Sequence, residues 1–346
     1  MPEVHKTLTR YTIEQEHRHL DSTGDFSGLL NAISTAVKII ANQVNKGALV
    51  GAPKNLDVIS NDVMIGETEW AGHLAAVASG RMPEIHPIPP SYRRGKYLLV
   101  FDPLDGSGGI DVDMAAGTIF SILRSPRPGE PAGVADFLQP GAEQVCAGFA
   151  LYGPATMLVL TTGDGVDGFT LDRDIGAFVL THPRMRIPET TNEFAINASN
   201  ERFWEPPVQR YVAECLAGRS GTREVDFTMR WVACLVAETF RILTRGGVFL
   251  DPGEGDPDDG AAGRPDRPRL LSAANPVAFL VEQAGGLAST GRRRLMDQVP
   301  GSLHERAPLI FGSRQEVARI ERYHRDRAGL PDDDFSLFNT RSLFRT

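Results

Sequence analysis

The chain has 346 residues, of which 41% are hydrophobic and 23% charged, and its formal net charge is −8. This length allows two domains, and the composition is that of an ordinary globular protein. The acidic balance argues against nucleic-acid binding, which needs clustered basic surface, but it is compatible with a local site for a small anion.

Two further features bear on location. The chain has no apolar run of the roughly 18 residues that cross a bilayer and no apolar leader at its N-terminus, so no membrane partner is expected. Cys146, Cys215 and Cys234 lack CxxC spacing and cannot all pair. They are typical of small core residues in a reducing compartment, and we expect a cytoplasmic protein.

The first hundred residues predict an arm, two helices and a loop. Residues 1–22 are polar, with mixed charge, and predict a loosely held arm. A helix capped by Thr23 or Asp25 is expected to run to Gly47, because its apolar residues recur on one face. Residues 54–73 predict a second helix, in which Asp57 is either an active-site carboxylate or an N-terminal cap. Four prolines in 79–96 predict a loop.

The apolar run 97–101 predicts a buried strand that ends on two carboxylates three residues apart, Asp102 and Asp105. The glycine-rich run 106–109 follows, and its backbone N–H groups could approach an anion closely. Paired carboxylates beside an anion-binding loop favour magnesium-assisted phosphate-ester chemistry. The alternative is a polar turn after a strand.

The rest of the chain predicts antiparallel strands followed by a second domain. Near His182 the character changes, so we expect domains at 1–183 and 184–327, with a tail at 328–346 that has no clear pattern. The mixture predicts a layered α+β architecture. Expected strands lie at 117–123, 145–150, 156–162, 169–171, 178–180, 194–197 and 247–250, and expected helices lie at 207–217, at 228–245, from a cap at Asn275 to Gly285, and from a capping box formed by Ser313 and Glu316.

Several segments together resemble class 1 fructose-1,6-bisphosphatases of the proteobacterial type. The resemblance extends from about residue 7 to about residue 325 and is far more specific than any single motif. The segments are Leu56-Asp57-Val58-Ile59-Ser60-Asn61-Asp62, Gly95-Lys96-Tyr97, Phe101-Asp102-Pro103-Leu104-Asp105-Gly106-Ser107, Gly117-Thr118-Ile119-Phe120, Tyr152-Gly153, Asn275-Pro276, Ala284-Gly285-Gly286 and Arg306-Ala307-Pro308.

This resemblance implies a fold and an activity. The fold would be an α-β-α-β-α sandwich of two domains, usually in a homotetramer. The activity would be hydrolysis of the 1-phosphate of fructose 1,6-bisphosphate with Mg²⁺, or with Mn²⁺, in gluconeogenesis or the Calvin cycle. Action on sedoheptulose 1,7-bisphosphate stays open.

The resemblance also implies roles for individual residues. Metal binding falls to Asp102, Asp105 and the carbonyl of Leu104, and Asp57 would support the nucleophilic water. The remaining assignments are Asp105, Gly106, Ser107 and Gly108 for the 1-phosphate, Asn197 for the 6-phosphate, Arg230 as an arginine lent by the adjacent subunit, Arg267 in place of a substrate-contacting lysine, and Thr23, Gly24, Lys96 and Tyr97 for inhibition by AMP.

The sequence departs from the family at several of its site positions. Gly80 and Arg81 replace two glutamates, Ala273 replaces a third, and Asp251 replaces a tyrosine of the sugar-phosphate pocket. Three interpretations follow: a working or weakened bisphosphatase, an impaired relative that acts as a ligand-binding or regulatory partner, or an error in the underlying gene sequence at Gly80-Arg81.

Overall fold

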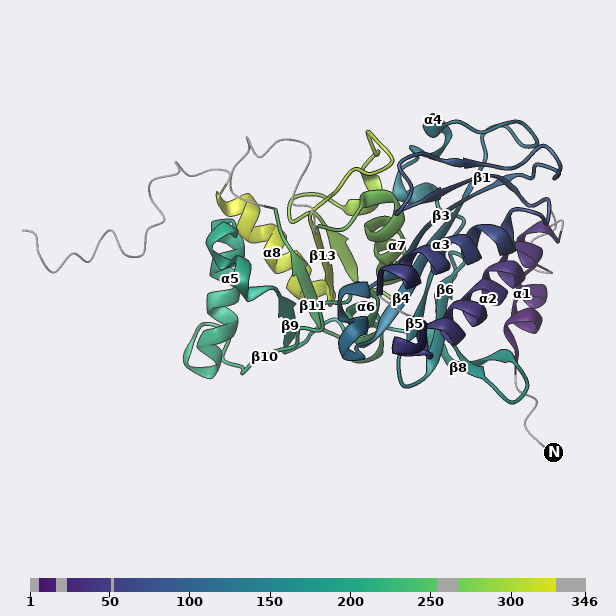
Figure 1. The fold of residues 1–346 in the computed structure, drawn as a ribbon. Helices are drawn as coiled ribbons and strands as arrows, with labels where there is room; N and C mark the ends of the chain where they lie inside the picture. The colour runs from purple at the N-terminus through teal and green to yellow at the C-terminus, as the bar shows by residue number, and fades with distance from the viewer. Residues whose placement is uncertain (1–5, 17–23, 51–52, 254–266, 328–346) are drawn as a thin grey trace, which may run out of the picture.

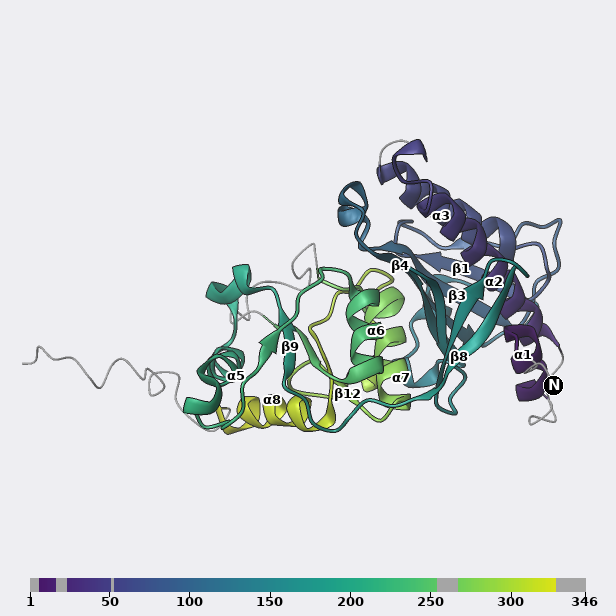
Figure 2. The ribbon, with the colours of Figure 1, turned by 90° about the horizontal axis from the view of Figure 1, so that it is seen from below.

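The computed structural model describes residues 6–16, 24–50, 53–253 and 267–327, and its ribbon is shown in Figure 1. The predictions for the tail at 328–346 and for Thr23 lie outside these residues. Within them, two β-sheets alternate with helices in layers (Figures 1 and 2).

The larger sheet has eight strands in the order β2-β1-β3-β4-β5-β6-β7-β8. Neighbouring strands are antiparallel except β1 and β3, which run parallel. Its strands are β1 (Leu74–Ser79), β2 (His86–Pro87), β3 (Tyr97–Asp105), β4 (Ala116–Arg124), β5 (Cys146–Tyr152), β6 (Thr156–Thr161), β7 (Val166–Asp172) and β8 (Ala177–Met185).

Helices α1 (Leu8–Glu16), α2 (Asp25–Val44) and α3 (Pro53–Thr68) lie on one side of this sheet (Figure 2). Helix α2 buries Leu29, Ile33, Val37 and Ile40, which share one face because the helical period is 3.6 residues. These residues form one core with side chains of the sheet, including Phe120. The predicted amphipathic helix is confirmed, but it ends at Val44, and Asp25 is its first residue rather than its cap, which is Gly24.

Helices α6 (Leu235–Arg245) and α7 (Asn275–Gln283) lie between the two sheets. Val236 of α6 and Val277 of α7 join a core that contains Phe149 of the larger sheet and Phe311 of the smaller one. The described part of the chain also contains the short helix α4 (Val134–Phe137).

The smaller sheet has the order β10-β9-β11-β13-β12. Helices α5 (Pro206–Ala217) and α8 (Arg314–Arg327) pack on its outer side through Tyr211, Val317 and Ile320. Its strands are β9 (Glu193–Ile196), β10 (Thr228–Met229), β11 (Val248–Asp251), β12 (Leu287–Ser289) and β13 (Leu309–Gly312). The layers therefore run α-β-α-β-α, and the α+β prediction is confirmed. No described helix is long and apolar enough to cross a membrane.

The prediction of a loosely held arm at residues 1–22 is wrong for Leu8–Glu16, which form helix α1 and are anchored to the larger sheet. The hydroxyl of Tyr11 donates a buried 2.8 Å hydrogen bond to Asp167. The predicted helix at 228–245 is also shorter, since Thr228–Met229 pair with β9 as β10 and α6 begins at Leu235.

Two predicted caps are wrong, for different reasons. Asn275 has helical dihedral angles (φ −62°, ψ −47°) and follows a π-helical turn, Leu270–Ala274, that leads directly into α7. Ser313 accepts a hydrogen bond from Gly247 N, and Glu316 binds Arg223 and Tyr211, so neither side chain forms the expected box.

Candidate active site

Strand β3 carries both motif aspartates in its last four residues. The apolar strand predicted at 97–101 thus extends through both carboxylates on which it was expected to end, because its pairing with β4 continues past a register shift between Asp102 and Asp105. The hydroxyl of Thr118 donates a 2.8 Å bond to the carbonyl of Pro103, which holds the irregular turn of the strand. Both carboxylates therefore lie at the end of a central strand.

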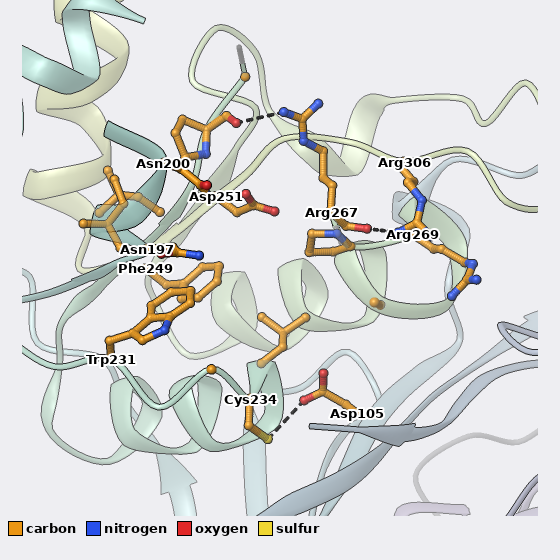
Figure 3. A pocket seen from close by; sticks show the side chains of 18 of the residues that line it. Asp105, Asn197, Asn200, Trp231, Cys234, Phe249, Asp251, Arg267, Arg269 and Arg306 are labelled. Atoms are coloured by element: carbon orange, nitrogen blue, oxygen red, sulfur yellow. Dashed lines mark hydrogen bonds between the residues drawn. The ribbon is translucent and has the colours of Figure 1, made fainter. Parts of the chain in front are cut away.

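A cavity of about 460 Å³ opens at this strand end. Figure 3 shows Arg267, Arg269 and Arg306 on one side of it and Trp231, Phe249 and Asn197 on the other. The residues that line it are Arg81, Asp102, Asp105, Ile196, Asn197, Asn200, Phe203, Trp204, Trp231, Ala233, Cys234, Leu235, Phe249, Leu250, Asp251, Pro252, Gly253, Arg267, Pro268, Arg269, Ala273 and Arg306.

The carboxylate of Asp105 is turned towards the beginning of α6. Its Oδ2 accepts a hydrogen bond of 2.9 Å from Val236 N and one of 3.2 Å from the thiol of Cys234. Burial raises the pKa of Asp105 to about 6, and Asp102 adds to the rise, while these hydrogen bonds oppose it. One oxygen of this predicted metal ligand therefore acts as the helix cap of α6.

Asp102 is surrounded by arginines. Burial raises its pKa, and the guanidinium groups of Arg81, Arg269 and Arg306 oppose that rise. Its Oδ1 is buried without a hydrogen-bond partner, as is Nε of Arg269. A buried donor and a buried acceptor that lack partners indicate a polar site adapted to receive water or a ligand.

Arg81 is placed beside Asp102 by the parallel pairing of β1 with β3, in which Ser79 lies opposite Phe101. Its Nη2 lies 2.9 Å from Oδ1 of Asp57 and 3.4 Å from the carbonyl oxygen of Leu104. It also donates to the hydroxyl of Ser107 at 3.4 Å. One guanidinium group thus contacts three predicted site residues, the catalytic Asp57, the metal ligand Leu104 and the phosphate ligand Ser107.

Asp57 lies in the second turn of α3, so the alternative that it caps this helix is wrong. Burial raises its pKa, and the positive charge of Arg81 opposes this effect. The structure thus brings Asp57 to the site through its ion pair with Arg81.

The residues present do not fit the metal pair that the family resemblance implies. Among the described residues, no group of three or more His, Cys, Asp or Glu side chains could hold a metal ion. A divalent ion needs several oxygen ligands, and here Arg81 already contacts the Asp57 carboxylate and the Leu104 carbonyl. An ion about 4 Å from one guanidinium would be opposed by about 8 kcal/mol at an effective dielectric constant near 20.

The opposite side of the cavity combines aromatic rings with a few polar side chains. Trp231 stacks on Phe249, with ring centroids 5.8 Å apart and planes 11° apart. Asn197 lies at the start of a 3₁₀ turn, where its Oδ1 accepts bonds from the backbone and hydroxyl of Ser199. Arg267 is buried and donates to the carbonyl of Pro252 at 3.1 Å. Aromatic faces with a few fixed polar groups are typical of small-molecule sites.

Other predicted site residues lie around the cavity or away from it. Gly106 has φ +75°, and a Cβ there would lie 2.9 Å from Sγ of Cys234, so the turn after β3 requires glycine. It leads into a 3₁₀ turn, Ser107–Val112, which contains Gly108. Arg230 does not line the cavity of its own chain, and its guanidinium lies 3.5 Å from Glu193.

The described part of the predicted AMP site forms a separate cluster at the beginning of α2. Gly24 precedes the helix with φ +74°. Nζ of Lys96 lies 3.4 Å from Asp25 and 5.5 Å from the centroid of the Tyr97 ring. The structure therefore brings Gly24, Lys96 and Tyr97 close to one helix end, where Asp25 already pairs with the lysine.

Sequence reasoning missed Arg269, Trp231 and Cys234 as lining residues, and it used Arg306 only as part of a family motif. The spacing in Arg267-Pro268-Arg269 was the available signal, because alternate residues of an extended segment point to the same side. Nothing in the sequence around Trp231 or Cys234 indicates that these residues face a site.

Comparisons with known proteins agree over nearly the whole chain. A family model described as the N-terminal domain of fructose-1,6-bisphosphatase matches residues 6–183, and one described as its C-terminal domain matches residues 187–325. The chain is 54% identical to a class 1 fructose-1,6-bisphosphatase of Hydrogenophilus thermoluteolus, covering 98% of this chain and 97% of the relative. It is 52% identical to one of Methylibium petroleiphilum, with the same coverage.

Solved structures are similar as well. The structure resembles the fructose-1,6-bisphosphatase of Leishmania major in its holo form, with a TM-score of 0.84 and 34% identity, over 94% of this chain and 100% of the other. The apo form of that protein gives a TM-score of 0.83 and 36% identity with the same coverage.

Proposed function

This chain belongs to the fructose-1,6-bisphosphatase family, and we propose that it hydrolyses the 1-phosphate of fructose 1,6-bisphosphate. It is a phosphoric monoester hydrolase, and its products would be fructose 6-phosphate and inorganic phosphate. The observation that carries this proposal is the cavity at the end of β3, which four arginines line together with Asp102 and Asp105. Arginine is well suited to phosphate because its planar fork can donate two hydrogen bonds to one anion.

In the proposed reaction, a water oxygen attacks the phosphorus of the 1-phosphate while the bond from phosphorus to the sugar oxygen breaks. We assign Asp57 to take the proton from the water, and the sugar oxygen leaves with a proton from solvent. Arg269, Arg306 and Arg81 would stabilise the charge on the phosphoryl oxygens. Members of the family generally depend on a metal, but the residues here do not fit one, so no step is assigned to Mg²⁺ or Mn²⁺.

The other end of the substrate would lie against Asn197, Trp231 and Phe249. A 6-phosphate there would gain from Arg267 and from the Arg230 position of a neighbouring subunit. This implies a homotetramer or a smaller assembly in which Arg230 crosses an interface. We further propose a domain boundary between residues 183 and 184, a cytoplasmic location, and AMP as the ligand of the cluster at Gly24, Lys96 and Tyr97.

The test is phosphate release from fructose 1,6-bisphosphate by the purified chain, measured with EDTA, Mg²⁺ or Mn²⁺. Fructose 6-phosphate is the matched control, since it lacks the 1-phosphate. We expect release from the bisphosphate alone, giving one phosphate per sugar. If no condition gives release while the protein remains folded, the proposal is wrong, and the ligand-binding alternative is favoured instead.

A further inference from the structure

We propose that the guanidinium of Arg81 stands where this family places its divalent metal, so that the cavity binds phosphate through arginines without a metal ion. The inference deepens the proposed function and relies on it only for the identity of the natural substrate. The inference is specific to this chain, because Arg81 occupies a position at which the family resemblance implies a glutamate.

The first support is the set of atoms that Arg81 contacts. Its Nη2 lies near a carboxylate oxygen of Asp57, the carbonyl oxygen of Leu104 and the hydroxyl of Ser107. Oxygen atoms of these types are the usual ligands of Mg²⁺ and Mn²⁺. A guanidinium also binds such oxygens, because every one of its N–H groups is a donor and its charge is fixed.

The local charge is the second support. Arg81, Arg269 and Arg306 all act on Asp102, whereas Asp105 is engaged by the beginning of α6. In the cavity lining as a whole, four arginines stand against three aspartates, namely Arg81, Arg267, Arg269 and Arg306 against Asp102, Asp105 and Asp251. This excess attracts a phosphate dianion and repels a divalent cation.

The third support concerns space at the two small residues. A Cβ at Gly80 would lie 3.3 Å from Oδ2 of Asp102, 3.1 Å from Oγ of Ser272 and 3.5 Å from Nη1 of Arg269. A side chain at position 80 would therefore crowd Asp102 and Ser272, and glycine adds neither bulk nor a carboxylate there. Ala273, which also lines the cavity, likewise adds no carboxylate. Gly80 and Ala273 therefore leave this part of the cavity without the two carboxylates that would compete with a phosphate for the arginines.

Arg81 remains accessible to a ligand, because 40% of its side chain is exposed while its backbone is fixed. Its N–H donates to Oγ of Ser79 at 3.1 Å, and that hydroxyl donates to Oδ1 of Asn61 at 2.6 Å. Arg269 adds a buried Nε with no hydrogen-bond partner. A phosphate oxygen would supply the missing acceptor.

The decisive experiment uses the full chain and two probes, Mn²⁺ and inorganic phosphate, in calorimetric titrations. For the unmodified protein we expect no Mn²⁺ binding below about 1 mM and equal phosphate affinity in EDTA and in Mn²⁺. Micromolar binding of Mn²⁺ to this site, together with loss of phosphate binding in EDTA, would overturn the inference. Both measurements are independent of catalysis, so a protein that is inactive but binds phosphate in EDTA contradicts the proposed function and supports the inference.

Variants locate the effect. Arg81→Gln should weaken phosphate binding in EDTA by about tenfold or more, Arg81→Lys by less, and the exposed Arg173→Gln not at all. The triple change Gly80→Glu, Arg81→Glu and Ala273→Glu should create Mn²⁺ binding, visible as a loss of the free-ion signal in electron paramagnetic resonance. Unchanged phosphate affinity in folded Arg81→Gln would contradict the inference.

Discussion

The stacked rings of Trp231 and Phe249 form the apolar side of the cavity. Trp231 is 38% exposed and its ring lies nearly parallel to that of Phe249. An exposed indole on one face of a site offers contact area to the carbon-rich face of a sugar while costing little rotamer freedom on binding. Because the other face of Trp231 rests on Phe249, its orientation is fixed before a substrate arrives.

We therefore expect Trp231→Ala to raise the KM for fructose 1,6-bisphosphate by about threefold to tenfold, with a smaller change in kcat. The matched control is Trp70→Ala, since Trp70 is 58% exposed and does not line the cavity. Steady-state kinetics of both variants are the measurement. Equal effects of the two substitutions would show that Trp231 takes no part in binding.

At the scale of elements, buried ion pairs attach α5 to α8 on the outer side of the smaller sheet. Arg223, just beyond α5, binds both carboxylate oxygens of Glu316 in α8 at 2.6 and 2.8 Å, and Tyr211 of α5 donates to Glu316 at 2.8 Å. The side chains of Arg223 and Glu316 are 6% and 5% exposed. Such a pair is costly to break because the remaining charge stays buried.

Arg223→Met or Glu316→Gln alone should lower the free energy of unfolding by about 3–5 kcal/mol. The double variant should lose clearly less than the sum of the two, because it leaves no unpaired charge. Arg219→Ala breaks an exposed pair with Asp226 and should cost less than about 1 kcal/mol. Urea unfolding of the four variants is the measurement, and additive losses would contradict the prediction.

A second link between elements depends on pH. Glu205, just before α5, pairs with the buried His324 of α8 at 3.1 Å and with Arg292 at 2.6 Å. Burial acts to raise the pKa of Glu205, but the hydrogen bonds and charges of His324 and Arg292 outweigh it, so the pKa lies below its ordinary value of 4.5. The unfolded chain consequently binds this proton more readily than the folded one.

The stabilisation from Glu205 should therefore be complete above about pH 4.5 and disappear as the pH falls through the lower pKa of the folded state. We expect Glu205→Gln to be less stable than the unmodified chain at pH 7, by about 1–3 kcal/mol. The difference should shrink below pH 4.5, with the exposed Glu201→Gln as the control. Chemical unfolding at several pH values tests this, and a constant difference would exclude Glu205 as the titrating group.

At the scale of the whole molecule, the close approach of α6 to the larger sheet joins the two halves of the site. Gly117 of β4 is the contact point, because a Cβ there would lie 2.7 Å from Cγ1 of Val236 and even closer to the carbonyl of Ala150. Val236 N also donates to Asp105. Packing between the layers and the position of Asp105 therefore depend on the same residue of α6.

We expect Gly117→Ala to lower the free energy of unfolding by about 1–3 kcal/mol and to lower kcat, because α6 must move away from Asp105. Gly66→Ala is the control: Gly66 is exposed in α3 with open space around its Cβ position, and alanine should stabilise that helix by about 0.5–1 kcal/mol. Thermal unfolding and kinetics distinguish the two. Unchanged kcat in Gly117→Ala would show that the packing of α6 against β4 does not affect the active site.

The sequence alone determined the layered α+β class, the amphipathic α2 and the strand that carries Asp102 and Asp105. These follow from local periodicity and from a family motif, both of which are readable in contiguous residues. It also identified the replacements at Gly80, Arg81 and Ala273.

Only the tertiary structure decided what those residues do together. Arg81 meets Asp57 because β1 and β3 run parallel and α3 lies over them, and Asp105 caps α6 from a point 131 residues away in the chain. The cap expected at Ser313 failed because Gly247, which is distant in the sequence, donates to its hydroxyl, and the cap expected at Asn275 failed because a π-helical turn already precedes this residue. Local patterns fix which elements form, and the packing of those elements fixes which charges meet.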